Sequence, residues 1–136
     1  MNLFIENKYT RWYFNIVGTR PQRVKGNEEY FESHHIMPKS MGGSNLKKNK
    51  ILLTVKEHFL VHWLLTKMCV DTVHKQKMLF AFSCMLRKNS THQRIYTSGQ
   101  YTILKDAARK KRTVICSDAT REKHRLRMID FKHSEE

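Results

Sequence analysis

The chain has 136 residues, which fits one domain and leaves too little sequence for two, because compact domains most often contain ~100 to 150 residues. A hydrophobic fraction of 40%, with seven Phe, five Tyr and two Trp, is enough for a packed core and excludes wholesale disorder. The 26 Lys and Arg against 12 Asp and Glu give a net charge of +14. This charge favours nucleic acid as the partner over an anionic membrane surface, and it is larger than solubility alone requires.

Residues 2 to 17 predict an amphipathic helix over much of their length, with its aromatic side packed inward. Large apolar side chains recur there at spacings near three and four. They are Leu3, Phe4, Tyr9, Trp12, Tyr13, Ile16 and Val17. The next ten residues contain glycine and proline, together with the basic residues Arg20, Arg23 and Lys25, and predict a loop that can touch phosphate.

The middle of the chain predicts a strand, a loop, a second strand and a helix. The run YFESHHIM, residues 30 to 37, suits a strand and stops at Pro38, which cannot donate to a ladder. The segment KSMGGSNLKKNK suits a loop with unusual backbone angles, and residues 51 to 54 suit the returning strand. Thr54 and Glu57 have the spacing of a capping box at the start of the helix HFLVHWLLTKM, although Glu57 could instead orient a neighbouring histidine.

Two further helices are expected in the second half of the chain. The run HKQKMLFAFSCMLRK after Asp71 is apolar at Met78, Leu79, Phe82 and Leu86 and predicts a scaffold helix. Residues 89 to 97 predict a polar connection, and residues 99 to 112 a helix that ends in ARKKR. Beyond Thr113 the sequence is basic and poor in large apolar groups, which predicts an exposed helix or an extended arm.

The cysteines and the N-terminus favour a soluble protein in a reducing compartment. Cys69, Cys84 and Cys116 are odd in number and far apart, so they predict neither a disulfide framework nor a CxxC metal site. The opening MNLFIENKYTRWYF lacks the layout of a secretory signal. No run approaches the ~18 apolar residues of a membrane span, so we expect a cytoplasmic location and no membrane partner.

Four of the eight histidines fall between residues 34 and 62. His58 and His62 are four residues apart on a predicted helix, so both rings can bind one ion from the same face. A strand sends His34 and His35 to opposite faces, so one can be a ligand while the other points elsewhere. Each feature alone has an ordinary explanation: helical histidines are often hydrogen-bonded core residues, and Asn49 alone is a turn residue. Their conjunction in a basic chain indicates a metal site directed at nucleic acid.

The stretches HHIMPKS, NKILLT and EHFLVH resemble the ββα-metal motif of the HNH nucleases, in particular the branch with a double histidine and two helical histidines, as in the nuclease colicins. The segments KYTRWYFNI and HHIMPKSMGGSN also resemble small HNH homing endonucleases of bacteriophages. The motif covers residues 34 to 62, and a looser likeness extends over residues 8 to 68. The likeness is specific for the chemistry and much less so for the biological role.

The resemblance implies a role for each of five residues. His34, His58 and His62 correspond to the metal ligands, and His35 to the general base that activates water. Asn49 corresponds to the central asparagine that holds the loop and keeps His35 aimed. Many relatives have Asp at the position of His34 and Asn at the last ligand position; three imidazoles suit Zn, Ni, Co or Mn better than Mg.

The resulting hypothesis is a mostly helical α+β protein with a ββα-metal core, a short antiparallel hairpin plus helix, flanked by helices. Residues 1 to 27 are expected to form the N-terminal helix and basic loop, 28 to 69 the core, and 70 to 136 a helical, basic DNA-binding extension, all in one compact domain. The expected function is hydrolysis of phosphodiester bonds in double-stranded DNA, as a phage-type homing or nicking endonuclease with one divalent ion (Mg, Mn, Zn or Ni). By resemblance the products carry 5′-phosphate and 3′-hydroxyl ends.

The expected DNA-binding residues are basic side chains on both sides of the motif. They are Arg20, Arg23, Lys39, Lys47, Lys48, Arg109, Lys110, Lys111, Arg112, Arg121 and Arg125. Arg11, Arg20 and Arg23 are candidates for a cation that steadies the transition state. Two alternatives stay open: a non-catalytic DNA-binding protein whose histidines, His35 included, enclose a structural zinc, and an RNA-binding protein that displays aromatic side chains for base stacking.

Overall fold

The computed structural model describes residues 2–21, 23–26, 29–87 and 94–111, with the single positions 119, 122, 123, 125 and 126. In this part of the chain the fold is mostly helical, with one two-stranded antiparallel sheet. The helices are α1 (Lys8–Thr19), α2 (Val55–Met68), α3 (Thr72–Cys84) and α4 (Ser98–Lys111). The strands are β1 (Glu32–His35) and β2 (Lys50–Leu53), and two short 3-10 turns, η1 (Lys39–Met41) and η2 (Lys47–Asn49), lie between them. The predicted α+β class is confirmed.

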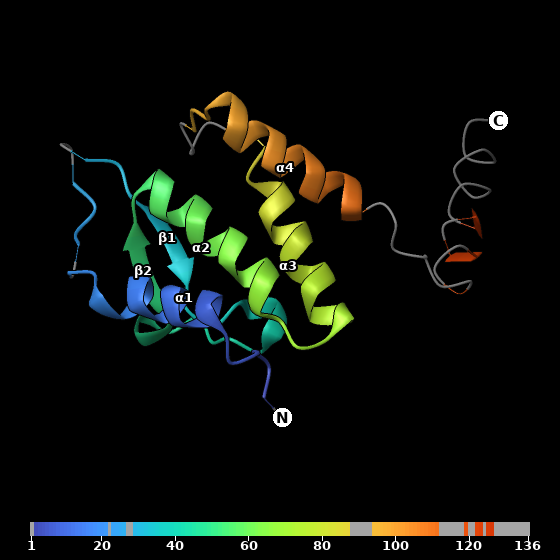
Figure 1. Ribbon diagram of the computed structural model, residues 1–136, viewed down its shortest axis with the longest axis horizontal. Helices are drawn as coiled ribbons and strands as arrows, with labels where there is room; N and C mark the ends of the chain where they lie inside the picture. Colours follow the sequence, from blue (N-terminus) through green and yellow to red (C-terminus); the bar gives the residue numbers. More distant parts are fainter. Residues whose placement is uncertain are drawn as a thin grey trace.

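The strand, loop, strand and helix that carry the histidines form a continuous unit (Figure 1). The register pairs His34 with Ile51 and His35 with Lys50. Because β1 alternates, Glu32 and His34 are buried while Ser33 is exposed. The first strand is shorter than the predicted range of residues 30 to 37, and the second begins and ends one residue before the predicted range of 51 to 54. Backbone pairing covers four residues in each strand.

Helix α2 begins with the predicted capping box. The Thr54 hydroxyl accepts from the backbone N–H of Glu57, and the Glu57 carboxylate accepts from the backbone N–H of Thr54. These bonds satisfy two of the N–H groups that have no partner within the helix. They fix the first turn of α2 directly after β2, which orients the face that carries His58 and His62.

Two apolar clusters hold the helices around α2. On one side α1 packs against α2, with Tyr13, Leu53 and Leu64 wholly buried. On the other side α2 packs against α3, and α3 against α4, around Phe82 and Leu104. Figure 1 shows α2 in the middle of this arrangement, with the hairpin beside its N-terminal half. The α2 helix thus connects the hairpin to the rest of the core.

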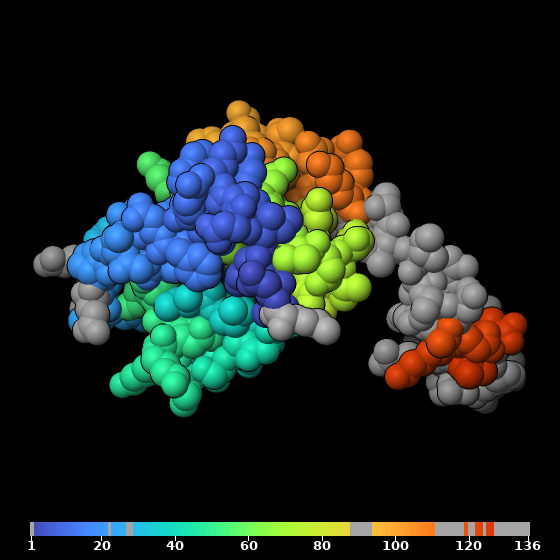
Figure 2. All heavy atoms as spheres, turned by 60° about the horizontal axis from the view of Figure 1, so that its bottom comes forward, coloured from blue at the N-terminus to red at the C-terminus, as the bar shows by residue number. Residues whose placement is uncertain are grey.

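The N-terminal helix is shorter than the sequence pattern predicted. It begins at Lys8, because the Asn7 side chain accepts from the backbone N–H groups of Tyr9 and Thr10 and caps it. The preceding residues are extended, and Phe4 forms a β-bridge with Cys69. The expectation of an inward aromatic side is only partly right, since Tyr13 is buried but Trp12 is 52% exposed. Figure 2 shows α1 (blue) on the surface beside the loop between the strands (teal) and α3 (yellow-green).

The other two helices lie where they were predicted, although α3 begins at Thr72 and ends at Cys84, before the last four residues of the predicted run. Asp71 caps α3 through the backbone N–H of His74, and Met78, Leu79 and Phe82 are buried, while Leu86 is only partly buried. The helix predicted at 99 to 112 is α4, which is described up to Lys111. Within the described ranges, no helix combines the length and the apolar character that a membrane span requires.

Candidate metal centre

Three histidines from two elements converge under the hairpin. His34 comes from the buried face of β1, and His58 and His62 come from successive turns of α2. The ring centroid of His34 lies 5.3 Å from that of His58 and 5.0 Å from that of His62. One ring nitrogen from each of the three residues lies within 4.8 Å of the other two, a separation at which they can ligate one metal ion. The helical spacing correctly predicted that His58 and His62 lie together, and His34 is the histidine of the adjacent pair that joins them, as the resemblance implied.

Hydrogen bonds to neighbouring groups fix the tautomers of two of these rings. The Tyr13 hydroxyl donates to the carbonyl of Ile36 at 2.7 Å and contacts Nε2 of His34 at 3.0 Å. Since that hydroxyl has only one proton, Nε2 of His34 is the donor and Nδ1 keeps its lone pair. The Nδ1 of His58 donates to the Glu32 carboxylate, which leaves the lone pair on Nε2. Both residues therefore present a lone pair for coordination.

The third ring, His62, leaves one nitrogen unsatisfied in either neutral tautomer. Its Nε2 lies 3.1 Å from Nε2 of His58, and its Nδ1 is buried without a hydrogen-bond partner among the described residues. If Nε2 donates to His58, Nδ1 is a buried lone pair with no donor; if Nδ1 carries the proton, two lone pairs face each other. A cation bound by the ring lone pairs removes the repulsion between the two Nε2 atoms, so the donor set fits a divalent metal ion.

Burial keeps two of the rings neutral. Desolvation, assisted by the nearby charges of His58 and His35, lowers the pKa of His34 to about 3. Desolvation also lowers the pKa of His62 well below its ordinary value, with further effects from His58 and His34. Neutral imidazole is the form that binds metal, so both residues are held in the ligating state at neutral pH.

The structure places His35 outside the three-histidine cluster. It follows His34 on β1, is only partly buried, and its Nε2 contacts Oδ1 of Asn45 at 3.1 Å. Both His34 and His35 border a hollow of about 340 Å³ whose rim includes Lys39 and Ser40. A chemical group bound in this hollow can therefore contact the three-histidine cluster and the ring of His35 at the same time. The closed four-ligand site, with His35 as a ligand, is not the observed arrangement.

Asn49 holds the loop that joins the two strands. Its Oδ1 accepts from the backbone N–H of Met37 at 2.8 Å, and its Nδ2 donates to the carbonyls of Met37 and Ser44 at 2.9 and 2.8 Å. The backbone carbonyl of Asn49 also accepts from the N–H of Ile36 at 2.9 Å. These bonds tie the residue directly before β2 to the residues directly after His35, which restricts the direction of that side chain.

The close approach of Gly43 to this region yields a stability prediction. A methyl group on Gly43 would lie 1.7 Å from the carbonyl oxygen of Met37 and 3.0 Å from Nδ2 of Asn49, so Gly43→Ala has to displace backbone. We expect this variant to lose more than about 3 kcal/mol of unfolding free energy in urea titrations. The control Gly18→Ala, in α1 with no atom within 4 Å of the added methyl, should gain about 0.5 to 1 kcal/mol. Equal stabilities of the two variants would contradict this description of the loop.

An ion pair behind the histidines was missed in the sequence. The Glu32 side chain is fully buried; it accepts from His58 and from Nε of Arg94 at 2.8 Å, and Nη2 of Arg94 lies 3.1 Å away. Burial alone would raise the pKa of Glu32, but the hydrogen bonds from His58 and Arg94 outweigh it and lower the pKa to about 2. Glu32 lies two residues before His34 on the same face of β1, a period-two signal that could have identified it. Arg94 comes from the connection before α4, where no sequence signal singled it out.

These pKa shifts predict that the metal-free protein loses stability in acid. The unfolded chain takes up a proton on the His34 and His62 rings near pH 6.5, whereas the folded protein does not, so the free energy of unfolding falls as pH decreases below 6.5. The contribution of Glu32 is present above pH 4.5 and is lost as pH falls from 4.5 towards 2.

Urea titrations in EDTA at a series of pH values between 7 and 4 test this expectation. The variant His34→Asn should show a smaller decrease between pH 6.5 and 5 than the wild type. A free energy of unfolding that stays constant over this range would show that the buried rings are not held neutral.

Glu57 does more than cap α2. Its carboxylate also pairs with Nε of Arg20 at 2.8 Å and with Nη1 of Arg23 at 2.5 Å, and the guanidinium of Arg23 lies over the ring of Phe31. The hydrogen bond from Arg23 is the main reason that the pKa of Glu57 is lowered to about 2. Capping was the preferred interpretation of Glu57, and it is confirmed; its two arginine partners were not foreseen. Arg20 and Arg23, both candidate DNA-binding residues, are thus already paired with a carboxylate.

The other candidate DNA-binding residues lie on several elements. Lys39 is exposed on η1 beside the histidine hollow, and Lys47 and Lys48 are exposed on η2. Arg109 and Lys110 are exposed on α4, and Arg125 pairs with Glu122 at 3.1 Å. The side chain of Lys111, together with Arg112 and Arg121, lies outside the described residues, as does most of the predicted basic arm. Arg11, a candidate for a further cation, is exposed on α1.

Comparisons with known proteins give relatives from one bacteriophage. The chain is 36% identical over 88 residues to the probable mobile endonuclease E of Enterobacteria phage T4, covering 65% of this chain and 59% of that protein. It is 37% identical over 99 residues to the probable mobile endonuclease C of the same phage, covering 71% and 43%. It is 40% identical over 62 residues to the probable mobile endonuclease D, covering 43% and 24%. The chain thus spans less than two thirds of each relative. No family model and no solved structure matches.

Proposed function

We propose that this chain is a metal-dependent endonuclease of the HNH type that hydrolyses phosphodiester bonds in double-stranded DNA, as a homing or nicking enzyme of the phage kind. The observation that carries the proposal is the convergence of the rings of His34, His58 and His62, with His35 beside them in the same hollow. The mobile-endonuclease names of the phage T4 relatives support a nuclease, and the net charge of +14 supports a nucleic-acid substrate.

In this proposal His34, His58 and His62 hold one divalent ion, either Mg, Mn, Zn or Ni. A bound ion supplies positive charge to the scissile phosphate and to the departing oxygen. Glu32 keeps His58 in the tautomer that offers its Nε2 lone pair, and Tyr13 does the same for Nδ1 of His34. The three imidazoles favour Mn, Zn or Ni over Mg, which prefers oxygen ligands.

His35 is assigned as the general base. A neutral imidazole at the edge of the hollow can take a proton from a water molecule that is aligned with the phosphate. The contact between Nε2 of His35 and Asn45 orients the ring, and the loop bonds of Asn49 fix the backbone from which it projects. Asn49 is therefore a positioning residue in this scheme. Its role does not require contact with DNA.

The hollow is open to a DNA backbone on the side where Lys39 lies. We assign Lys39, Lys47, Lys48, Arg109, Lys110 and Arg125 to contacts with phosphates, which position the duplex without reading its sequence. Arg20 and Arg23 can also contact phosphates only if their ion pairs with Glu57 break. Such an enzyme acts on DNA in the cytoplasm of the host cell.

One experiment tests the proposed function. Purified protein is incubated with supercoiled plasmid in EDTA, and Mg, Mn, Ni and Zn are then added back singly. We expect no cutting in EDTA and nicked or linear plasmid with at least one ion. An uncut plasmid with every ion, while the protein still binds DNA, would favour the alternative of a non-catalytic DNA-binding protein with a structural zinc.

A further inference from the structure

A second hollow lies on the outer face of the hairpin and takes no part in the histidine centre. It has a volume of about 600 Å³, within the range of small-ligand sites. Its apolar surface comes from β2, the end of α1 and the loop that follows, including Val17, Val24 and Leu52. Its rim is basic, with Lys25, Lys47 and Lys50. An apolar floor beneath a cationic rim suits a ligand that is part apolar and part anionic.

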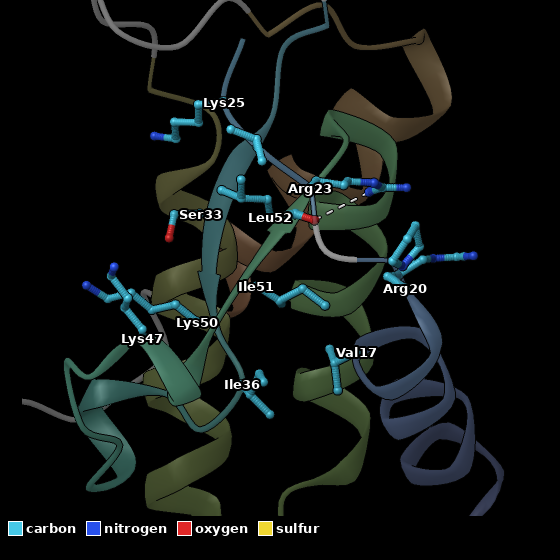
Figure 3. A pocket seen from close by; sticks show the side chains of 12 residues that line it. Val17, Arg20, Arg23, Lys25, Ser33, Ile36, Lys47, Lys50, Ile51 and Leu52 are labelled. Carbon is cyan, nitrogen blue, oxygen red and sulfur yellow. Dashed lines mark hydrogen bonds between the residues drawn. The ribbon is translucent and has the colours of Figure 1, made fainter.

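The basic residues of this rim fall into two groups. Figure 3 shows Arg20 and Arg23 on one side of the hairpin and Lys25, Lys47 and Lys50 on the other. The two arginines share the Glu57 carboxylate. Lys25, Lys47 and Lys50 are exposed and have no carboxylate partner among the described residues. The three lysines are therefore the part of the rim that is available to an anion.

The register of the hairpin connects this hollow to the histidine site. His35 pairs with Lys50, and Ser33 pairs with Leu52, so these four side chains occupy the outer face of the two strands. Side chains of directly opposite residues have Cβ atoms about 4.5 to 5.5 Å apart, which makes Lys50 the cross-strand neighbour of His35. Ser33 borders both hollows. A nucleic-acid strand at the histidine site can thus continue over Ser33 to the lysine side of the second hollow.

We propose that the outer hollow is a nucleotide subsite, which seats a nucleotide next to the scissile phosphate of the DNA. Lys47 and Lys50 bind its phosphate, and the apolar side chains of Leu52 in the hollow and Val24 at its rim contact its sugar or base. This inference rests on the proposed endonuclease function for the identity of the substrate. It predicts that the DNA crosses the hairpin along its outer face and does not approach only from the side of Lys39.

The charge part of the proposal is tested by binding without catalysis. A fluorescein-labelled DNA duplex is titrated in EDTA at several salt concentrations, with the double variant Lys47→Ala/Lys50→Ala. Each lost phosphate contact lowers the slope of log affinity against log salt by about 0.9, so we expect a decrease of nearly twice that value. The control Lys8→Ala/Lys67→Ala removes the same charge at the aromatic rings of Tyr9 and Trp63 and should leave the slope near that of the wild type.

The apolar part is tested by a matched pair of exposed valines. Val24, at the rim of the hollow, is 83% exposed, and Val70, between α2 and α3, is 53% exposed, so glutamate is compatible with the fold at both. We expect Val24→Glu to weaken duplex binding at least tenfold and Val70→Glu to change it by less than about threefold, because only the first places a carboxylate against the bound nucleotide.

The outcomes separate this inference from the proposed function. If the wild type cuts plasmid with metal but the two double lysine variants have equal salt slopes, the subsite is wrong and the endonuclease stands. Equal effects of the two valine variants also overturn the subsite. If the slope falls as expected while no metal restores cutting, the DNA contact at the hollow is supported and the endonuclease function is lost.

Discussion

Replacing His35 by Ala is expected to lower the rate of DNA cleavage by a factor of about 10² to 10⁴, the range that a general acid or base contributes. The residue borders the hollow but belongs neither to the buried core nor to the three-histidine cluster. Its ring is partly exposed, and its Nε2 contacts Oδ1 of Asn45. Removal of the imidazole should therefore leave the fold, the affinity for metal and the affinity for DNA close to those of the wild type.

Single-turnover cleavage of plasmid, combined with duplex binding and metal titration on the same preparation, measures this effect. His74→Ala removes a partly exposed imidazole from α3 and serves as the control, with an expected rate equal to the wild type. Asn45→Ala should produce an intermediate loss, since it removes the group that orients the His35 ring. Cleavage by the His35 variant at the wild-type rate would show that another group accepts the proton.

Replacing His62 by Ala should have the second large effect, a loss of metal binding and of cleavage together. His62 supplies one of the three imidazoles in the cluster. The other two rings cannot offer a second nitrogen in its place, because Nε2 of His34 and Nδ1 of His58 are held by Tyr13 and Glu32. We expect the affinity to fall by more than the roughly 10- to 100-fold that loss of a supporting partner costs.

Competition with a chromophoric chelator measures the metal affinity of this variant. Glu32→Gln provides the graded comparison: it keeps the ligands but weakens the hydrogen bond that orients His58, so its affinity should fall about 10- to 100-fold. His35→Ala should bind metal as the wild type does. An unchanged metal affinity in the His62 variant would mean that any bound ion lies elsewhere.

The main part of the candidate site was predictable because helix and strand geometry are strictly periodic. A spacing of four residues places His58 and His62 on one helix face, and alternation along β1 separates His34 from His35. The capping pattern of Thr54 and Glu57 fixed the start of α2 to the residue. The glycine pair indicated the loop, and the close approach of Gly43 to Met37 explains why the second of these positions needs glycine.

Features that depend on contacts between distant segments were not predictable in this way. Arg94 pairs with Glu32, which lies 62 residues earlier in the sequence. Glu57 pairs with Arg20 and Arg23, which come from a loop more than 30 residues before it. Periodicity also gave the wrong start of α1, because apolar residues before Lys8 pack as an extended segment against the end of α2. Lys50 was overlooked because only strand register places it opposite His35.

A crystal structure of the protein soaked with Mn or Ni, with anomalous data collected at the metal edge, tests the central claim most directly. We predict one strong peak at about 2.0 to 2.2 Å from one nitrogen each of His34, His58 and His62, with His35 outside the coordination sphere. A peak that includes His35 as a fourth ligand would contradict this assignment and support a closed structural site. A peak remote from these three rings would contradict it altogether.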